Sequence, residues 1–123
     1  MGSRILIVDD ERDLVDAYMR LLERSGHVCF GAFNAADAIK LIDSERPGLI
    51  VTDLSLADGN GLEVLLHARA KLPGSPVIVI TGQNTSDLAH KAREAGATEC
   101  LLKPVPIISL KRIIEEALAA SAH

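Results

Sequence analysis

Six residues able to bind a cation or a phosphoryl group lie at or just after the ends of short apolar runs: Asp9, Asp10, Asp53, Thr81, Gly82 and Lys103. Three carboxylates placed together repel one another and favour a hard divalent cation such as Mg²⁺, which binds oxygen ligands. A carboxylate can also act as a nucleophile and form an aspartyl phosphate. During transfer, the negative charge of a phosphoryl group is stabilised by a metal ion, a lysine and hydroxyl or amide hydrogen-bond donors. If the fold brings these residues together, they are suited to phosphoryl transfer onto an aspartate.

Five apolar runs alternate with amphipathic stretches along the chain. The runs are residues 5–8, 28–30, 49–51, 77–80 and 100–102, and helical spacing covers residues 14–25, 35–42, 62–66, 88–95 and 107–117. Short continuous apolar runs are typical of strands buried on both faces of a parallel sheet. Strict alternation of strand and helix predicts a doubly wound α/β fold, with a five-stranded parallel sheet and helices on both faces. Two strand orders are common for such sheets, and the periodicity does not choose between them.

The carboxyl ends of parallel strands share one edge of the sheet, and α/β proteins bind their ligands there. We therefore expect the three acids to share a crevice with Thr81 and Lys103, and Asp53 is the best candidate nucleophile. Each residue alone has an ordinary explanation: Asp9 and Asp10, for example, could be acids at a helix N-terminus. Their coincidence at one sheet edge favours the phosphoryl-transfer interpretation.

Composition bounds the function further. The chain has 123 residues, with 13 Lys and Arg against 17 Asp and Glu, a formal net charge of −4. This length suits one domain, which we expect over residues 4–121, with no second domain and residues 1–3 as a cloning remnant. The mild acidity argues against direct nucleic-acid or membrane binding, and no apolar run approaches the roughly 18 residues that span a bilayer. Two cysteines, Cys29 and Cys100, are too few for a disulfide framework and are expected in strands, in a reduced, cytoplasmic protein.

The chain resembles, over essentially its whole length, the receiver domain of bacterial two-component response regulators. Four segments carry the resemblance: Ile7–Glu11, Thr52-Asp53 with Gly61 eight residues on, Thr81-Gly82 and Lys103-Pro104. The resemblance implies the flavodoxin-like strand order 2-1-3-4-5 and a cis peptide bond before Pro104. It also implies a signalling domain rather than an enzyme.

The resemblance assigns roles to the candidate residues. Asp53 would be the phosphoacceptor, with a sensor histidine kinase or a phosphotransfer protein as donor. The expected ligands of Mg²⁺ (or Mn²⁺) are Asp9, Asp10, Asp53 and the backbone carbonyl of Ser55. Thr81 and the N–H of Gly82 would contact the phosphoryl group, and Lys103 would pair with the acids or the phosphate. The partner surface would be the helix at 88–95, the strand at 100–102 and the helix at 107–117, contacting an output domain, another protein or a second copy. The helix at 88–95 would shift most, because its apolar stripe is weak.

Three positions depart from the usual pattern of the family. Ala57 stands four residues after the phosphoacceptor, where most receivers have Pro. Cys100 replaces a Tyr or Phe whose rotation usually reports phosphorylation. The segment Lys103–Pro106 reads Lys-Pro-Val-Pro where Lys-Pro-Phe is usual. Ser55 and Gln83 occupy the two variable positions that, in this family, influence how fast the phosphate is lost.

Two other interpretations compete with a phosphoacceptor. One is an aspartate-nucleophile phosphohydrolase of the haloacid dehalogenase type, which requires a second Asp two residues after its nucleophile. Ser55 stands at that spacing from Asp53, and the chain has no residues for a cap domain. The other is a receiver-like protein-binding module that does not switch by phosphate. The intact set of acids, Thr81 and Lys103 argue against this alternative, while Cys100 leaves it open.

Overall fold

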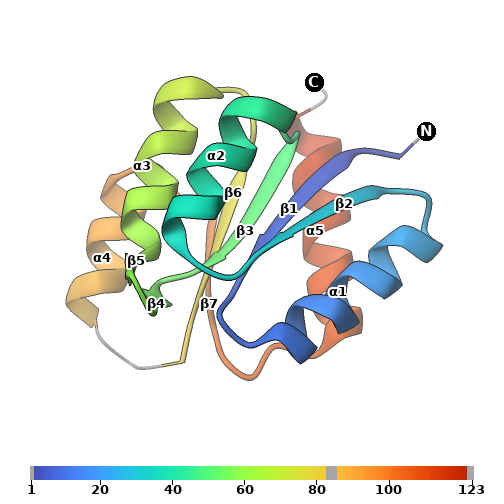
Figure 1. Ribbon diagram of the computed structural model, residues 1–123, viewed down its shortest axis with the longest axis horizontal. Helices are drawn as coiled ribbons and strands as arrows, with labels where there is room; N and C mark the ends of the chain where they lie inside the picture. Colours follow the sequence, from blue (N-terminus) through green and yellow to red (C-terminus); the bar gives the residue numbers. More distant parts are fainter. Residues whose placement is uncertain (1, 83–85, 122–123) are drawn as a thin grey trace.

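A five-stranded parallel sheet forms the centre of the computed structural model, which describes residues 2–82 and 86–121 (Figure 1). The strands are β1 (Arg4–Val8), β2 (Val28–Ala32), β3 (Leu49–Asp53), β6 (Val77–Thr81) and β7 (Glu99–Leu102). Their order across the sheet is β2-β1-β3-β6-β7. This confirms the doubly wound fold and the order 2-1-3-4-5, counted over the sheet strands alone. Gln83, one of the two variable positions, lies outside the described residues.

Helices cover both faces of the sheet. They are α1 (Arg12–Arg24), α2 (Ala35–Glu45), α3 (Gly61–Lys71), α4 (Ser86–Glu94) and α5 (Ile107–Ser121). Buried side chains of α2, α3 and α4 pack into one core, and those of α1 and α5 pack into a second core on the opposite face. Strand side chains alternate between these cores, so that Leu6 enters the first and Ile7 the second. Burial on both faces explains why the strands are continuous apolar runs.

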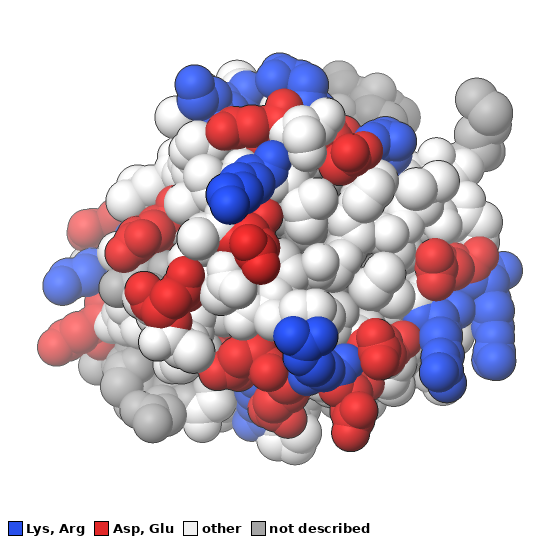
Figure 2. Space-filling model, viewed as in Figure 1, with Lys and Arg blue, Asp and Glu red and all other residues white. Residues whose placement is uncertain are grey.

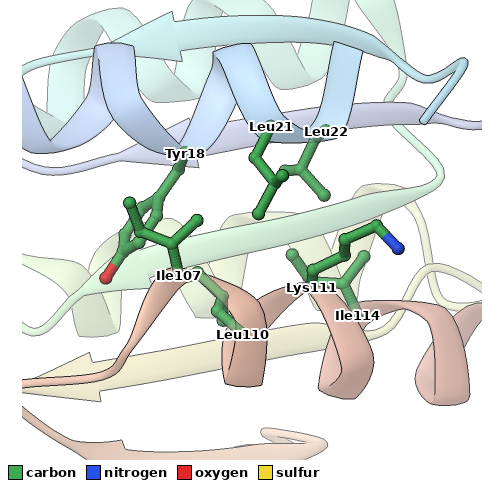
Figure 3. A pocket seen from close by; sticks show the side chains of 7 residues that line it. All are labelled: Tyr18, Leu21, Leu22, Ile107, Leu110, Lys111 and Ile114. Atoms are coloured by element: carbon green, nitrogen blue, oxygen red, sulfur yellow. The ribbon is translucent and has the colours of Figure 1, made fainter. Parts of the chain in front are cut away.

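The helices on the second face pack closely on each other. Figure 3 shows the contact between α1 and α5, lined by Tyr18, Leu21, Leu22, Ile107, Leu110, Lys111 and Ile114. The gap between these side chains has no room for a water molecule. Tyr18 and Ile114 are almost fully buried, at 3% and 0% exposed. The position of α5, and of the loop before it, is therefore tied to α1.

Local sequence signals mark the ends of two helices. Gly26 follows α1 with a φ of 93°, in the left-handed region that favours glycine. Asn34 precedes α2, and its side chain accepts a hydrogen bond from the N–H of Asp37 at 2.8 Å. One element was not predicted: the antiparallel pair β4 (Ser55–Leu56) and β5 (Gly59–Asn60), directly after β3. Two-residue strands have no periodicity, so the sequence shows only a turn signal there.

The helix α4 is the least buried of the five among the described side chains. Ala92 alone is buried, while Leu88 and Ala89 are partly exposed. This agrees with the weak apolar stripe of the sequence. No helix in the described ranges has the length and apolar character needed to cross a bilayer.

Candidate functional site

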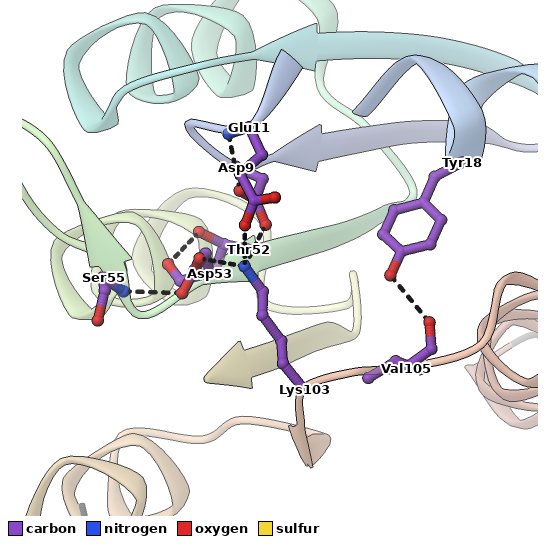
Figure 4. Close-up of polar contacts among 8 residues, drawn as sticks. All are labelled: Asp9, Glu11, Tyr18, Thr52, Asp53, Ser55, Lys103 and Val105. Atoms are coloured by element: carbon purple, nitrogen blue, oxygen red, sulfur yellow. Dashed lines mark hydrogen bonds and ion pairs between the residues drawn. The ribbon is translucent and has the colours of Figure 1, made fainter. Parts of the chain in front are cut away.

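Three of the candidate residues, Asp9, Asp53 and Lys103, converge at the carboxyl edge of the sheet, as expected (Figure 4). Asp9 follows β1 directly, Asp53 ends β3, Thr81 ends β6 and Lys103 follows β7. These strands are neighbours in the sheet, and their pairing aligns Asp53 with Ile80 on the next strand. Figure 2 shows acidic side chains along this lower edge of the molecule, with basic side chains among them.

Three carboxylates form a cluster in which one oxygen of each lies within 4.8 Å of the others: Asp9, Asp10 and Asp53. Asp9 and Asp53 are buried, at 4% and 5% exposed, whereas Asp10 is exposed. Backbone groups orient both buried acids: the N–H of Glu11 donates to Asp9 Oδ1 and the N–H of Ser55 to Asp53 Oδ1, each at 2.9 Å. Closely spaced carboxylate oxygens, one open to solvent, fit a Mg²⁺ ion that keeps several of its waters.

Lys103 forms ion pairs with two of these acids, Asp9 and Asp53. Its Nζ lies 2.9 Å from Asp9 Oδ2 and 2.7 Å from Asp53 Oδ2, and 3.5 Å from Glu11 Oε1. Burial lowers the pKa of the Lys103 ammonium, but its hydrogen bonds and charge attraction to Asp53 and Asp9 outweigh this and raise the pKa above its ordinary value. Lys103 is therefore a fixed positive charge beside the candidate nucleophile.

The neighbouring strand ends supply the uncharged groups. Thr81 is buried at 6% exposed, and its carbonyl accepts the backbone N–H of Lys103 at 2.8 Å. Gly82 is exposed and lies beside the Lys103 stem, where a Cβ would be 3.6 Å from Cδ. Thr81 thus ends the strand next to β3, and Gly82 follows it directly, as expected. The peptide bond between Lys103 and Pro104 is cis, also as expected.

Gly61 lies against the backbone of the candidate nucleophile. A Cβ on Gly61 would be 1.9 Å from the carbonyl oxygen of Asp53 and 2.8 Å from its carbonyl carbon. The N–H of Gly61 donates to the carbonyl of Leu54 at 3.0 Å, which fixes this approach. Position 61 therefore requires glycine, because any side chain there would collide with the backbone at the end of β3. The approach is this close because α3 begins beside the end of that strand.

Two supporting residues were missed by sequence reasoning. The hydroxyl of Tyr18, a residue whose ring lies in the core, donates to the carbonyl of Val105 at 3.1 Å, two residues beyond Lys103 (Figure 4). Asp58 begins the sequence Asp-Gly-Asn-Gly at 58–61, which by itself indicates only a turn, yet its carboxylate accepts hydrogen bonds from the start of α2. Tyr18 and Val105 are 87 positions apart, so no local signal could have revealed that contact.

Cys100 lies in β7 and is partly buried, as expected of a strand residue. Its Sγ is 3.9 Å from the carbonyl oxygen of Ala89 in α4. Burial raises the pKa of the Cys100 thiol. The thiol thus connects β7 to α4 at the position where the family usually has an aromatic ring. The other thiol, Cys29, is buried in β2, where burial raises its pKa to about 11.

Comparisons with known proteins agree with this arrangement. The family model of the response regulator receiver domain matches residues 5–115. The response regulator protein PilR of Pseudomonas aeruginosa is 35% identical over 116 residues, which cover 94% of this chain and 26% of PilR. The chain thus spans about a quarter of the length of that relative.

Solved structures show the same likeness over nearly complete chains. A CheY-like receiver domain from Methanospirillum hungatei superposes with a TM-score of 0.95 at 31% identity, covering 99% of this chain and 98% of that one. The beryllofluoride-activated receiver domain dimer of NtrC4 superposes with a TM-score of 0.87 at 33% identity, covering 96% and 98%. The chain therefore belongs to the response regulator receiver domain family.

Proposed function

We propose that this chain accepts a phosphoryl group on Asp53 from the phosphohistidine of a sensor kinase or phosphotransfer protein, and that this switches a partner surface. The observation that supports the proposal most is the contact of Lys103 with a buried aspartate in a cluster of three carboxylates. Phosphoryl transfer requires a nucleophile and positive charge around the phosphoryl oxygens. Asp53 supplies the first and Lys103 part of the second.

The transfer itself is a displacement at phosphorus. A carboxylate oxygen of Asp53 forms the new O–P bond while the N–P bond of phosphohistidine breaks, and the electron pair remains on the imidazole nitrogen. Lys103, Thr81 and the N–H of Gly82 are proposed to bind the phosphoryl oxygens as their charge redistributes. The hydrogen bond from the Ser55 N–H holds the Asp53 carboxylate in one orientation.

Mg²⁺, or Mn²⁺, is the proposed cofactor. Its ligands would be Asp9, Asp10, Asp53 and the backbone carbonyl of Ser55, with water filling the remaining positions. When bound, the ion neutralises charge on the phosphoryl oxygens. Lys103 already forms ion pairs with the two buried acids of this ligand set, Asp9 and Asp53.

Acetyl phosphate tests the proposal without a kinase. We expect intact-mass spectrometry to show one added phosphoryl group in the presence of Mg²⁺, and none when EDTA removes the metal. The same sample is expected not to turn over a generic phosphate ester such as p-nitrophenyl phosphate, because Ser55 stands where a phosphohydrolase has its second Asp. Uptake that is equal with and without metal, or steady ester hydrolysis, would contradict the proposal.

The partner surface is proposed to be α4, β7 and α5. Leu102 at the end of β7 is 57% exposed, and Ile108 in the first turn of α5 is 79% exposed. Large exposed apolar side chains favour contact with another protein. That protein would be an output domain, a separate target in the cytoplasm or a second copy of this chain, as in the dimer of the NtrC4 receiver domain.

Hydrogen exchange tests whether phosphorylation reaches this surface. Beryllofluoride with Mg²⁺ stands in for the phosphoryl group, and we expect it to change the exchange of amides in α4 more than in α2. The reason is that few buried contacts hold α4, so that it opens at low cost in free energy. Unchanged exchange in α4 at saturating beryllofluoride would contradict this route, with Asp53→Asn as the control that should show no change.

A further inference from the structure

Asp58 ties the loop after the proposed phosphoacceptor to the start of α2. Its carboxylate accepts hydrogen bonds from the N–H groups of Ala35 and Ala36, at 2.8 and 3.1 Å. These are the first two residues of α2, whose N–H groups have no partner within the helix. Asn34 already caps the helix through the N–H of Asp37. Asp58 therefore adds a bond between segments that are more than 20 positions apart.

The loop of residues 54–60, with Asp58 near its tip, follows the proposed nucleophile directly. Within it, β4 and β5 pair, so that Ser55 lies opposite Asn60 and Leu56 opposite Gly59. The N–H of Ser55 donates to Asp53 Oδ1 at 2.9 Å. If the tip moved, the paired strands β4 and β5 would therefore move with it, and so would the Ser55 N–H that holds the carboxylate of Asp53.

The start of α2 is in turn connected to the strand end that carries Asp9. The N–H of Asp9 donates to the carbonyl of Ala32 at 3.1 Å. Ala32 ends β2, and only Phe33 and Asn34 separate it from Ala35, where α2 begins. The hydrogen bonds of Asp58 thus link the loop that follows Asp53 to the segment between β2 and α2, which is itself bonded to Asp9 through the Ala32 carbonyl. Both acids belong to the carboxylate cluster.

This loop lacks the restraint of a proline. Ala57 stands four residues after Asp53, and alanine leaves free the φ angle that proline would fix. We propose that Asp58 supplies the missing restraint and is a positioning residue, which holds the Asp53 carboxylate and the Ser55 carbonyl in place for metal and phosphoryl binding. The inference rests on the proposed function of Asp53.

Asp58→Ala in the full chain tests the proposal. We expect the Kd for Mg²⁺, measured by isothermal titration calorimetry, to rise about tenfold, the lower end of the losses seen when a group that supports metal ligands is removed. Phosphoryl uptake from acetyl phosphate should slow at limiting Mg²⁺ and recover at saturating Mg²⁺. Asp58→Asn keeps one acceptor oxygen and should give an intermediate Kd, and this variant carries the comparison if Asp58→Ala does not fold. Ala57→Pro, added to Asp58→Ala, should restore the affinity.

Asn34→Ala is the matched control, because it removes a side-chain cap from the same helix end and leaves the tie through Asp58 intact. It should lower the melting temperature as Asp58→Ala does, with the Mg²⁺ affinity of the wild type. If Asp58→Ala also binds Mg²⁺ like the wild type, Asp58 is only a helix cap and the proposal is overturned. Failure of Asp53 to take up a phosphoryl group is a separate result: it contradicts the proposed function, while the Mg²⁺ comparison still decides the role of Asp58.

Discussion

Replacement of Asp53 by Asn is expected to abolish phosphoryl uptake completely. The amide has nearly the shape of the carboxylate, but its oxygen is a far weaker nucleophile and cannot form a stable acyl phosphate. Because the amide oxygen can still accept the N–H of Ser55, the loop after β3 keeps its hydrogen bond. We therefore expect a folded protein whose mass does not change after incubation with acetyl phosphate and Mg²⁺.

The control for this result is Asp16→Asn, which removes one exposed carboxylate from α1 and should leave uptake unchanged. Circular dichroism of both variants checks that the fold is retained. A phosphoryl group added to Asp53→Asn at the wild-type rate would place the modification on another residue, and Asp53 would then not be the phosphoacceptor.

The second large effect is expected for Gly61→Ala. The new Cβ would lie 1.9 Å from the carbonyl oxygen of Asp53, a distance that no side-chain adjustment can relieve because both atoms belong to backbone-fixed positions. The end of β3 cannot retreat easily either, since the N–H of Leu54 donates to the carbonyl of Ile80 at 2.9 Å. We expect destabilisation of about 3 kcal/mol, typical of overpacking in a rigid surrounding.

Thermal unfolding measures this effect. A loss of about 3 kcal/mol corresponds to a fall in melting temperature of roughly 10 °C or more in a chain of this size. Gly74→Ala is the matched control, because a Cβ there would meet no atom within 4 Å, and its melting temperature should stay close to that of the wild type. Equal melting temperatures for the two variants would show that α3 can move away from β3, and that Gly61 is not required by contact.

The fold and the main site residues could be predicted because they depend on local patterns. Burial on both faces makes each strand of the sheet an apolar run, and the same topology places the residues after those runs at one edge. The observed strands extend past the runs to Asp53 and Thr81, since backbone pairing continues where the apolar pattern ends. Hydrophobic periodicity therefore does not detect polar residues at the end of a strand, whereas the spacing of the sequence motifs does.

The supporting contacts could not be predicted, because they join segments that only the fold brings together. Asp58 and Ala35 are 23 positions apart, and Asp58 in a turn has an ordinary local explanation. The contact between Tyr18 and Val105 depends on how α1 packs on α5. Helical spacing shows only that Tyr18 faces the core, and the partner of its hydroxyl follows from tertiary packing.

The most direct test of the account is to locate the phosphoryl group chemically. Borohydride reduces an aspartyl phosphate to homoserine, which survives digestion and marks the modified position in peptide mass spectrometry. After incubation with acetyl phosphate and Mg²⁺, we predict homoserine at position 53 and unmodified aspartate at Asp9 and Asp10. Homoserine at either of those positions, or its absence from position 53 in a protein that has gained a phosphoryl group, would contradict the account.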